Sequence, residues 1–434
     1  MLNKIIGILI IILLQNLLAE EYGLAEVLKM AEANNKTIQL ARADLKTAAA
    51  EVKGAYSAAL PKLDVNLGYN RNFKESKFFF TVTDTSGREI TQSFRTSFTN
   101  QYQANAVLRQ TLLSLQVGYG IQAARYFRRL SEENFEFIRQ QVLAQTKIAF
   151  YQTLLLKEVL LVAQDSESSA KDNYENIKVK FESGIVSEFD LLQAEVRWQN
   201  SIPETFQAAQ QYELALNNLK VLVGFPLEQP MPLRGAIDQF PALPETPGFE
   251  AVTAQRPDYN ALVWQKKLQE KNVSAQKADR FPVLEGVLQY NYTAASDAFR
   301  FDNENDNYFL GLSLSIPLFS GGRTSAQIRK ARADLDRANT RIAEADDNIR
   351  IQLANLQLRM KEARERISAA NKAAFSARRA FEIAETRVDN GLSTQVELKD
   401  SRVALDRAQL NYYSAIFDYL RAYFEWELAT GKVE

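Results

Sequence analysis

The chain has 434 residues and a formal net charge of −1 at pH 7, with neither cysteine nor histidine. The near-neutral charge gives no indication of a nucleic-acid partner, and the missing cysteines exclude disulfides, thiolate metal sites and cysteine nucleophiles. Histidine, the commonest general base and metal ligand near neutral pH, is absent too. We therefore expect no enzyme, no cofactor and no metal centre.

Residues 1–19 have the features of a signal peptide. Lys4 precedes an apolar run from Ile5 to Leu14, and Ala19 lies at the expected cleavage site. The run is too short to cross a bilayer as a helix. An N-terminal membrane anchor is the alternative. No later segment is apolar enough for a transmembrane helix, so we expect any further membrane-spanning part to consist of strands.

After a predicted helix at about 24–60, closed by Pro61, the chain alternates strictly between apolar and polar residues. Such alternation predicts a strand between two different environments. The polar, aromatic-rich stretch 73–100 follows, and similar alternation recurs at 102–109, 284–292 and 308–316. Each segment has a suitable length for a tilted transmembrane strand. The polar positions predicted to line a barrel lumen are Lys62, Asp64, Asn66, Arg109 and Glu285.

Four strands are too few to close a barrel, for which about eight are the practical minimum. A barrel therefore requires several copies of the chain. The alternative is a four-stranded sheet whose apolar side covers the core of a soluble protein.

Very long helices are predicted at 118–182 and 321–389. The second carries one apolar heptad seam from Ile328 to Val388, with a single stutter between Ile349 and Leu353, which predicts a coiled coil. Helices at 187–224 and 394–430 have the right lengths to return antiparallel beside them, and another helix is expected at 251–281. Pro203 should interrupt and kink the 187–224 helix.

The chain reads as two repeats. Gly184–Gly224 and Gly391–Gly431 align without a gap, and a shift of 221 residues places Pro61 on Pro282. We predict a tandem duplication with repeats at 20–224 and 251–431. The segment 225–250 between them holds six of the eleven prolines and is predicted to be a connecting belt without helix or central strand.

In the order and spacing of these features the sequence resembles the TolC-type outer-membrane efflux proteins (outer-membrane factors). The resemblance rests on the duplication, the turns at Gly184 and Gly391, and the motifs Arg256-Pro257-Asp258-Tyr259, Phe281-Pro282 and Ile316 to Arg323. It implies an α+β membrane protein of a Gram-negative outer membrane. Three copies would form a twelve-stranded barrel in lipid, continued by a periplasmic α-barrel of long helical hairpins.

The resemblance also implies a function. Such a trimer is the exit duct of a tripartite efflux or type I secretion system, joined to an inner-membrane transporter by a periplasmic adaptor. A passive porin would explain the strands but not the coiled coils. A structural periplasmic coiled-coil protein would explain the helices but not the strands.

Three acidic residues are candidates for a periplasmic gate. Family members carry acids at the positions of Asp190, Glu397 and Asp400, and the resemblance implies an acidic ring at the tunnel entrance. The family's tyrosine and arginine partners are replaced by Val388 and Ser393. The alternative is that Ser187-x-x-Asp190 and Thr394-x-x-Glu397 are only capping boxes, and that Asp400 is only solvated.

The two hairpin turns are the candidate adaptor-docking surface. Each combines a glycine with an apolar residue at a predicted tip, and the positions are Gly184, Ile185, Gly391 and Leu392. Ordinary helix C-caps with a buried hydrophobic residue are the alternative.

Overall fold

The computed structural model describes residues 21–83 and 85–433. The predicted signal peptide therefore lies outside the described residues. The described chain divides into two compact units. Unit 1 comprises residues 21–45, 131–262 and 341–433, and unit 2 comprises residues 46–130 and 263–340. Each unit takes segments from both predicted repeats.

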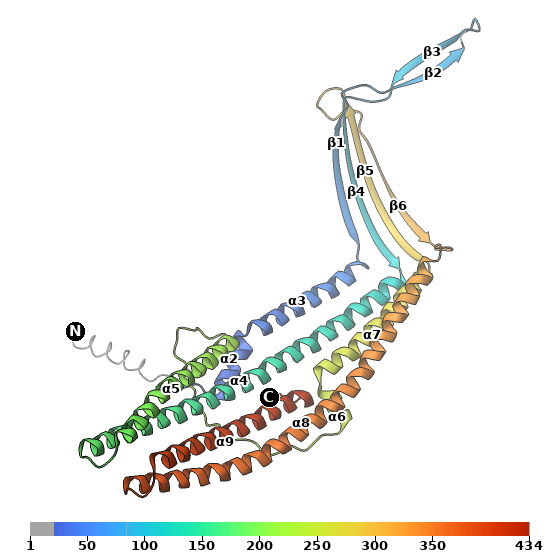
Figure 1. The fold of residues 1–434 in the computed structure, drawn as a ribbon. Coiled ribbons are helices and arrows are strands. Elements are labelled where there is room, and N and C mark those ends of the chain that lie inside the picture. Colours follow the sequence, from blue (N-terminus) through green and yellow to red (C-terminus); the bar gives the residue numbers. More distant parts are fainter. Residues whose placement is uncertain (1–20, 84, 434) are drawn as a thin grey trace, which may run out of the picture. The chain divides into compact units, whose positions relative to one another are not determined.

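Unit 2 contains a four-stranded antiparallel sheet (Figure 1), and its strands confirm the four predicted ones. The order is β1 (Lys62–Arg71), β4 (Asn100–Leu113), β5 (Val283–Ser296) and β6 (Asn305–Ser315). The registers align like with like across the sheet. One row of directly opposed residues is entirely leucine, and a row on the other face is entirely asparagine: Leu63, Leu108, Leu288, Leu310; Asn66, Asn105, Asn291, Asn307. The sheet is therefore amphipathic, as predicted.

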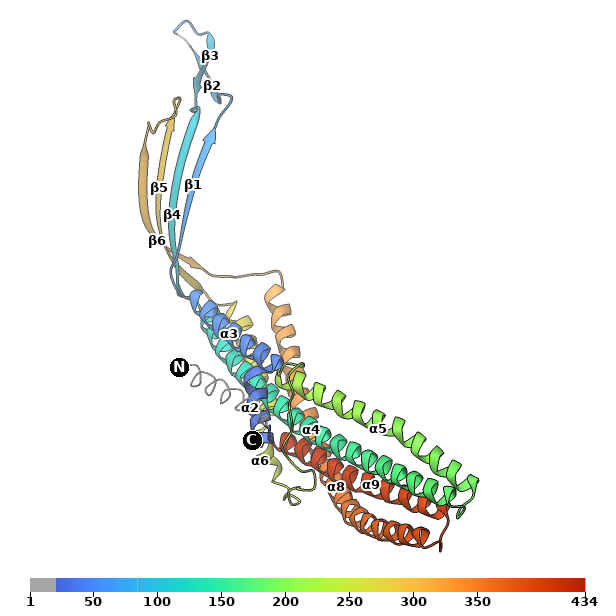
Figure 2. The ribbon, with the colours of Figure 1, turned by 90° about the vertical axis from the view of Figure 1, so that its left-hand side faces the viewer.

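A second, two-stranded sheet lies within the stretch 73–100, where no strand was predicted. It is a hairpin of β2 (Lys77–Thr83) and β3 (Glu89–Arg95), visible beyond the ends of β1 and β4 in Figure 2. An ion pair between Arg95 and Asp297 holds its base, and the backbone N–H of Thr99 donates to Asp297 Oδ1 at 3.0 Å. The hairpin is thus anchored to the β5–β6 loop.

The prediction of a single helix at 24–60 is wrong. The structure has α2 (Leu24–Asn34) and α3 (Lys36–Ser57), separated at Asn35. The Asn35 Oδ1 accepts hydrogen bonds from the backbone N–H groups of Thr37 and Ile38, so it caps α3. Its Nδ2 donates to Leu222 O at 2.7 Å. A second break, at Arg256, divides the helix predicted at 251–281 into α6 (Phe249–Gln255) and α7 (Pro257–Ala278).

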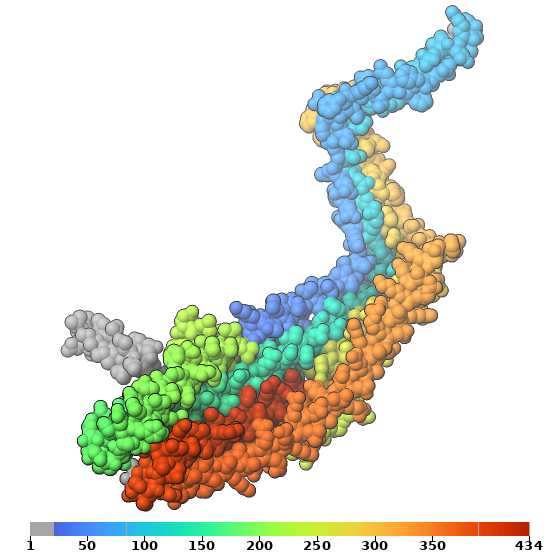
Figure 3. Space-filling model, viewed as in Figure 1, coloured from blue at the N-terminus to red at the C-terminus, as the bar shows by residue number. Residues whose placement is uncertain are grey.

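Two long helical hairpins dominate unit 1. One joins α4 (Leu115–Glu182) to α5 (Glu188–Val223), and the other joins α8 (Arg323–Asp389) to α9 (Gln395–Thr430). The seam predicted along α8 is confirmed, because each of its positions from Ile328 to Val388 is buried or half-buried. Pro203 lies inside α5, which continues through it, so the predicted interruption is wrong. Figure 3 shows α4 and α5 next to each other, and Tyr174 of α4 stacks on Trp198 of α5 with ring centroids 5.3 Å apart.

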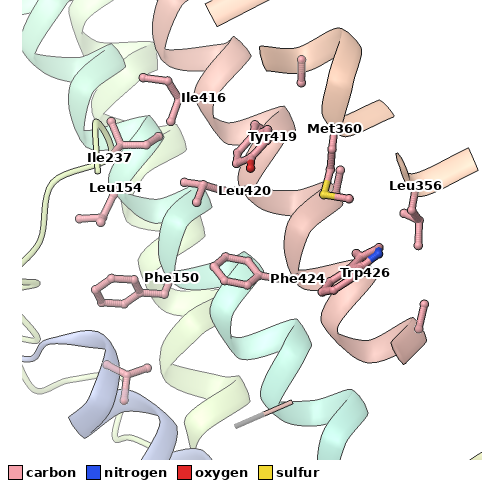
Figure 4. Close-up of a cluster of buried hydrophobic side chains, with 14 of the residues drawn as sticks. Phe150, Leu154, Ile237, Leu356, Met360, Ile416, Tyr419, Leu420, Phe424 and Trp426 are labelled. Atoms are coloured by element: carbon pink, nitrogen blue, oxygen red, sulfur yellow. The ribbon is translucent and has the colours of Figure 1, made fainter. Parts of the chain in front are cut away.

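The core of unit 1 lies between α4, α8, α9 and the belt (Figure 4). Phe150 and Leu154 of α4 meet Tyr419 and Leu420 of α9 in one buried cluster. The Tyr419 hydroxyl is satisfied by Pro241 O at 2.9 Å. The belt has neither helix nor named strand from 226 to 248, as its prolines predict, and it closes one side of this core with Met231, Leu233 and Ile237.

Candidate functional site

Both helical hairpins turn on a glycine in the left-handed region, with φ of 73° at Gly184 and 71° at Gly391. In each turn the next residue donates its backbone N–H to the carbonyl five residues earlier: Ile185 to Lys180 and Leu392 to Arg387, both at 2.8 Å. This is the Schellman arrangement of a helix C-terminus. Only glycine adopts such a φ without strain.

The apolar residues of the two turns are exposed rather than buried. Ile185 is 71% exposed and Leu392 is 69% exposed. A Schellman motif usually covers its hydrophobic residue against the preceding helix turn. The predicted alternative of a helix C-cap with a buried hydrophobic residue is therefore confirmed for the cap and wrong for the burial, and each tip presents an apolar side chain.

In the first hairpin the acidic candidate Asp190 forms a complete capping box with Ser187. Its carboxylate accepts hydrogen bonds from the Ser187 hydroxyl at 2.6 Å and the Ser187 backbone N–H at 3.2 Å. The Asp190 backbone N–H donates back to Ser187 Oγ at 3.2 Å. The predicted capping role is confirmed here, and it engages Oδ2 of the carboxylate.

The second hairpin is capped differently. The Thr394 side chain accepts from the Glu397 backbone N–H at 3.2 Å, but the Glu397 carboxylate accepts from the Ser393 hydroxyl. The reciprocal half of the predicted capping box is therefore replaced by a bond to the residue before the cap. Asp400 is exposed, three residues further along α9. All three acids thus lie in the first two turns of α5 or α9.

The two turns lie at the same end of unit 1 (Figure 1). The hairpins are joined near this end by a hydrogen bond of 2.8 Å from Asn173 Nδ2 of α4 to Gln395 Oε1 of α9. The fold therefore brings Asp190 and the Glu397–Asp400 pair together at one end of the bundle.

A groove of about 530 Å³ lies behind the tips, between the two hairpins. Apolar side chains of α5, among them Phe189 and Leu192, form one wall, and the α9 segment Gln395 to Arg402 forms the other. Both apolar residues are more than half exposed. The groove extends the apolar surface of the tips along the bundle.

An ionic cluster around a buried arginine, at the end of this groove, ties α9 to α4, and sequence reasoning did not find it. Arg402 is only 6% exposed and donates to Asp165 at 2.9 Å and Asp406 at 2.8 Å. Asp406 also accepts from the Ser166 hydroxyl at 2.9 Å. Burial raises the pKa of the Asp406 carboxyl, although Arg402 and Ser166 act in the opposite direction. The sequence signal was the four-residue spacing of Arg402 and Asp406 on one helix.

The five predicted lumen residues are exposed on the sheet. Lys62 lies directly opposite Arg109, and Arg109 Nη1 lies 3.6 Å from Asp64 Oδ2. Beside them the asparagine row is hydrogen-bonded. Asn105 Nδ2 donates to Asn291 Oδ1 at 2.5 Å, and Asn291 Nδ2 donates to Asn307 Oδ1 at 2.9 Å. The polar face therefore carries charged residues at the end of the sheet where β1 begins, and a row of asparagine amides further along β1.

Among residues 21–83 and 85–433, no helix is both long and apolar enough to span a membrane. Over the same residues, no cluster of three or more acidic side chains has the geometry of a metal site. A four-stranded amphipathic sheet and long helical hairpins with exposed apolar residues at their turns are the features expected of the outer-membrane efflux proteins that the sequence resembles.

Comparison with known proteins agrees with this architecture. The model of the family described as outer membrane efflux protein matches residues 27–225 and 249–432. Because this match covers most of the chain, the chain belongs to the outer membrane efflux protein family, and the resemblance noted in the sequence is confirmed. The family is one of transport proteins of the Gram-negative outer membrane.

The relatives are distant but extend over most of the chain. The alkaline protease secretion protein AprF of Pseudomonas aeruginosa is 22% identical over 87% of this chain and 78% of that protein. The outer membrane protein TolC of Vibrio cholerae is 21% identical over 94% of this chain and 90% of that protein. The Campylobacter jejuni CmeC outer membrane channel covers 94% of this chain and 85% of its own at 19% identity, with a TM-score of 0.76, which shows a shared fold.

Proposed function

We propose that this chain is the outer-membrane exit duct of a tripartite efflux or type I secretion system. The observation that carries the proposal is the combination of a four-stranded amphipathic sheet with two long hairpins whose apolar tips are exposed. A porin needs no such hairpins, and a periplasmic coiled coil needs no such sheet. Relatives named for protease secretion and for efflux support both kinds of system.

The working form in this proposal is a homotrimer. β1 and β6 are the two edges of the four-stranded sheet, and unpaired backbone groups are not tolerated in lipid. Since three antiparallel pairings separate them, β6 of one copy meets β1 of the next in antiparallel orientation. Three copies supply twelve strands, enough to enclose a lumen.

The entrance of the duct lies at the hairpin tips in this proposal, with Asp190, Glu397 and Asp400 forming an acidic ring. Their shared location at one end of unit 1 supports the assignment, and Asp400 is the best candidate because neither cap uses it. A ring of carboxylates favours cations and hinders anions. Without the family's tyrosine and arginine, the Arg402 cluster supplies an ionic link between the hairpins.

The tips also form the docking surface for a periplasmic adaptor. Exposed Ile185 and Leu392 supply apolar contact area there. Their burial on docking stabilises the complex by about 25 cal/mol per Å² of apolar surface. An inner-membrane transporter then delivers the substrate to the open entrance.

Single-channel conductance in planar bilayers tests this function. The gate predicts that Asp400→Asn raises a small wild-type conductance and weakens the block by divalent cations, because one charge per copy is lost from the ring. Asp347→Asn is the matched control, since Asp347 is an exposed acid on α8 more than forty residues before the turn; it should behave as wild type.

Two results would count against the proposal. A large conductance that is the same in wild type and Asp400→Asn favours a passive porin and removes Asp400 from the entrance. A protein that forms no channel under any condition contradicts the duct itself.

A further inference from the structure

The two open edges of the sheet carry complementary side chains. Arg71 is the last residue of β1, and Asp306 is the second residue of β6, at the same end of the sheet. Both belong to the apolar face of the sheet, where their partners within the chain are aromatic: Arg71 lies over the Phe73 ring, and Asp306 accepts a hydrogen bond from the Tyr290 hydroxyl at 3.5 Å. We infer that β6 pairs with β1 of a second copy in the register that places Asp306 opposite Arg71 and Asn307 opposite Asn70. This inference rests on the proposed trimer and specifies its seam.

The two faces of the sheet limit the possible registers. On β1 the even-numbered residues are polar except for Gly68, and the odd-numbered ones are apolar except for Arg71, whereas on β6 Tyr308, Leu310 and Leu312 occupy the even positions. A slip of one residue would place a whole apolar set on the polar face. Only registers that pair even residues of β1 with odd residues of β6 keep the barrel amphipathic.

The tilt of the strands excludes the simplest of these registers. Within the chain the row of opposed asparagines runs from Asn66 to Asn307. Joining Asn307 to Asn66 of the next copy would close the row into a flat ring without stagger. Barrel strands are tilted, and a tilt requires such a row to return displaced along the strand. That register also leaves Tyr69 and Arg71 without partners in β6.

A displacement of four residues per copy satisfies every requirement. Asn307 then meets Asn70, and all ten residues of β1 find a partner in β6. Three copies give a total stagger of about 12 residues, which with a rise of ~3.3 Å and a strand spacing of ~4.8 Å corresponds to a tilt of about 35°. On the lipid side the opposed residues are apolar or oppositely charged: Leu63–Leu314, Val65–Leu312, Leu67–Leu310, Tyr69–Tyr308, Arg71–Asp306.

Larger displacements fit less well. A shift of six residues tilts the strands by about 46°, sets Gly68 opposite Gly311 and leaves Lys62 unpaired. A shift of eight is the register obtained by copying the β4–β5 junction onto the seam between copies. It gives a tilt of about 54°, beyond the usual range of about 35–45°, and places Arg71 against Leu310.

Disulfide trapping reads this register directly, because the chain has no native cysteine. The Asn72 N–H donates to Thr99 O across the β1–β4 ladder, so by the two-residue period even residues of β1 direct their backbone groups towards β4. Facing the open edge, these residues form non-hydrogen-bonded pairs with Cα atoms about 4.5 Å apart. This spacing suits a disulfide.

The experiment compares double-cysteine variants of the full chain in detergent after mild oxidation. Asn70→Cys/Asn307→Cys is expected to form a reducible covalent trimer, and Asp64→Cys/Ser313→Cys repeats the test elsewhere in the same register. Asn66→Cys/Asn307→Cys probes the flat ring, and Asn66→Cys/Ser315→Cys probes the shift of eight. In the inferred register each of these two control pairs is misaligned by four residues, about 13 Å, beyond the ~7 Å limit of a disulfide.

The outcomes separate the register from the proposed function. Cross-linking of both inferred pairs but neither control pair supports the register. Cross-linking of a control pair, or a trimer by mass without a cross-link at Asn70→Cys/Asn307→Cys and Asp64→Cys/Ser313→Cys, overturns the register and leaves the trimeric duct intact. A protein that is monomeric by mass and forms no cross-link overturns both.

Discussion

The two predicted repeats agree closely in their helices and differ where their strands end. α3 and α7 are displaced by 221 residues at both ends, from 36 to 257 and from 57 to 278. α5 and α9 are displaced by 207 residues at both ends. Between paired strands, however, the first repeat carries the β2–β3 hairpin and the second only a short loop. Helices that share a packed core keep their spacing, whereas a loop beyond the strand ends has no such constraint.

The largest effect is expected at Arg402, a position at which the second repeat has a buried charged side chain and the first repeat does not. Arg402 links two carboxylates while almost completely buried, and its counterpart in the first repeat, 207 residues earlier, is the half-buried Glu195. Arg402→Met should lower the free energy of unfolding by about 3 kcal/mol, because it removes the cation that is hydrogen-bonded to the half-buried Asp406 and leaves only the more weakly acting Arg197. Glu195→Gln should change it by less than about 0.5 kcal/mol.

Urea unfolding of the purified protein measures both variants. Equal, small effects would mean that the cluster is solvated in the assembled protein and that the repeats do not differ here. The Arg402→Met/Asp406→Leu double variant should recover part of the loss, because replacing a whole buried pair by apolar groups is far less costly than breaking it.

The next largest effect distinguishes the glycines that end α5 and α9 from the glycines at the two hairpin turns. Gly224 and Gly431 end α5 and α9 with φ of 67° and 73°. A Cβ on Gly431 would lie 2.5 Å from Gln255 O, whereas Gly391 at the tip has open space around the same position. Gly391→Ala should cost about 1–2 kcal/mol for its positive φ alone. Gly431→Ala should cost about 2–3 kcal/mol, since the backbone must also move.

Thermal unfolding of the two alanine variants checks this order. If Gly391→Ala proves as destabilising as Gly431→Ala, the tip glycine is enclosed in the assembled protein. Gly224→Ala should fall between them, because its nearest contacts, Asn34 Cβ at 2.8 Å and Asn34 O at 3.0 Å, are less close than the 2.5 Å contact at Gly431.

Periodic features of the fold could be predicted from the sequence, whereas breaks and loops were harder to predict. The α8 seam and the four strands follow from periodicity, because one side of each element must avoid water. The break at Asn35 was missed, although the 221-residue shift aligns it with Arg256, which precedes Pro257. The β2–β3 hairpin was missed because the alternation of Phe78, Phe80 and Val82 was interpreted only as aromatic content.

The Arg402 cluster depends on tertiary structure instead. Asp165 and Arg402 are 237 residues apart, and no local pattern indicates which side chains two antiparallel helices bring together. The tip acids were found, but the sequence did not reveal that Ser393 rather than Thr394 binds the Glu397 carboxylate.

The smallest effect concerns the caps of the two hairpins. Ser187 both donates to and accepts from Asp190, whereas Thr394 only accepts from the Glu397 backbone. Ser187→Ala should therefore destabilise the first hairpin by about 1 kcal/mol, and Thr394→Ala the second by about 0.5 kcal/mol. Hydrogen exchange of the first turns of α5 and α9 measures each local loss separately. If Thr394→Ala has the larger effect, the Ser393–Glu397 bond depends on the cap, and the second hairpin is capped as cooperatively as the first.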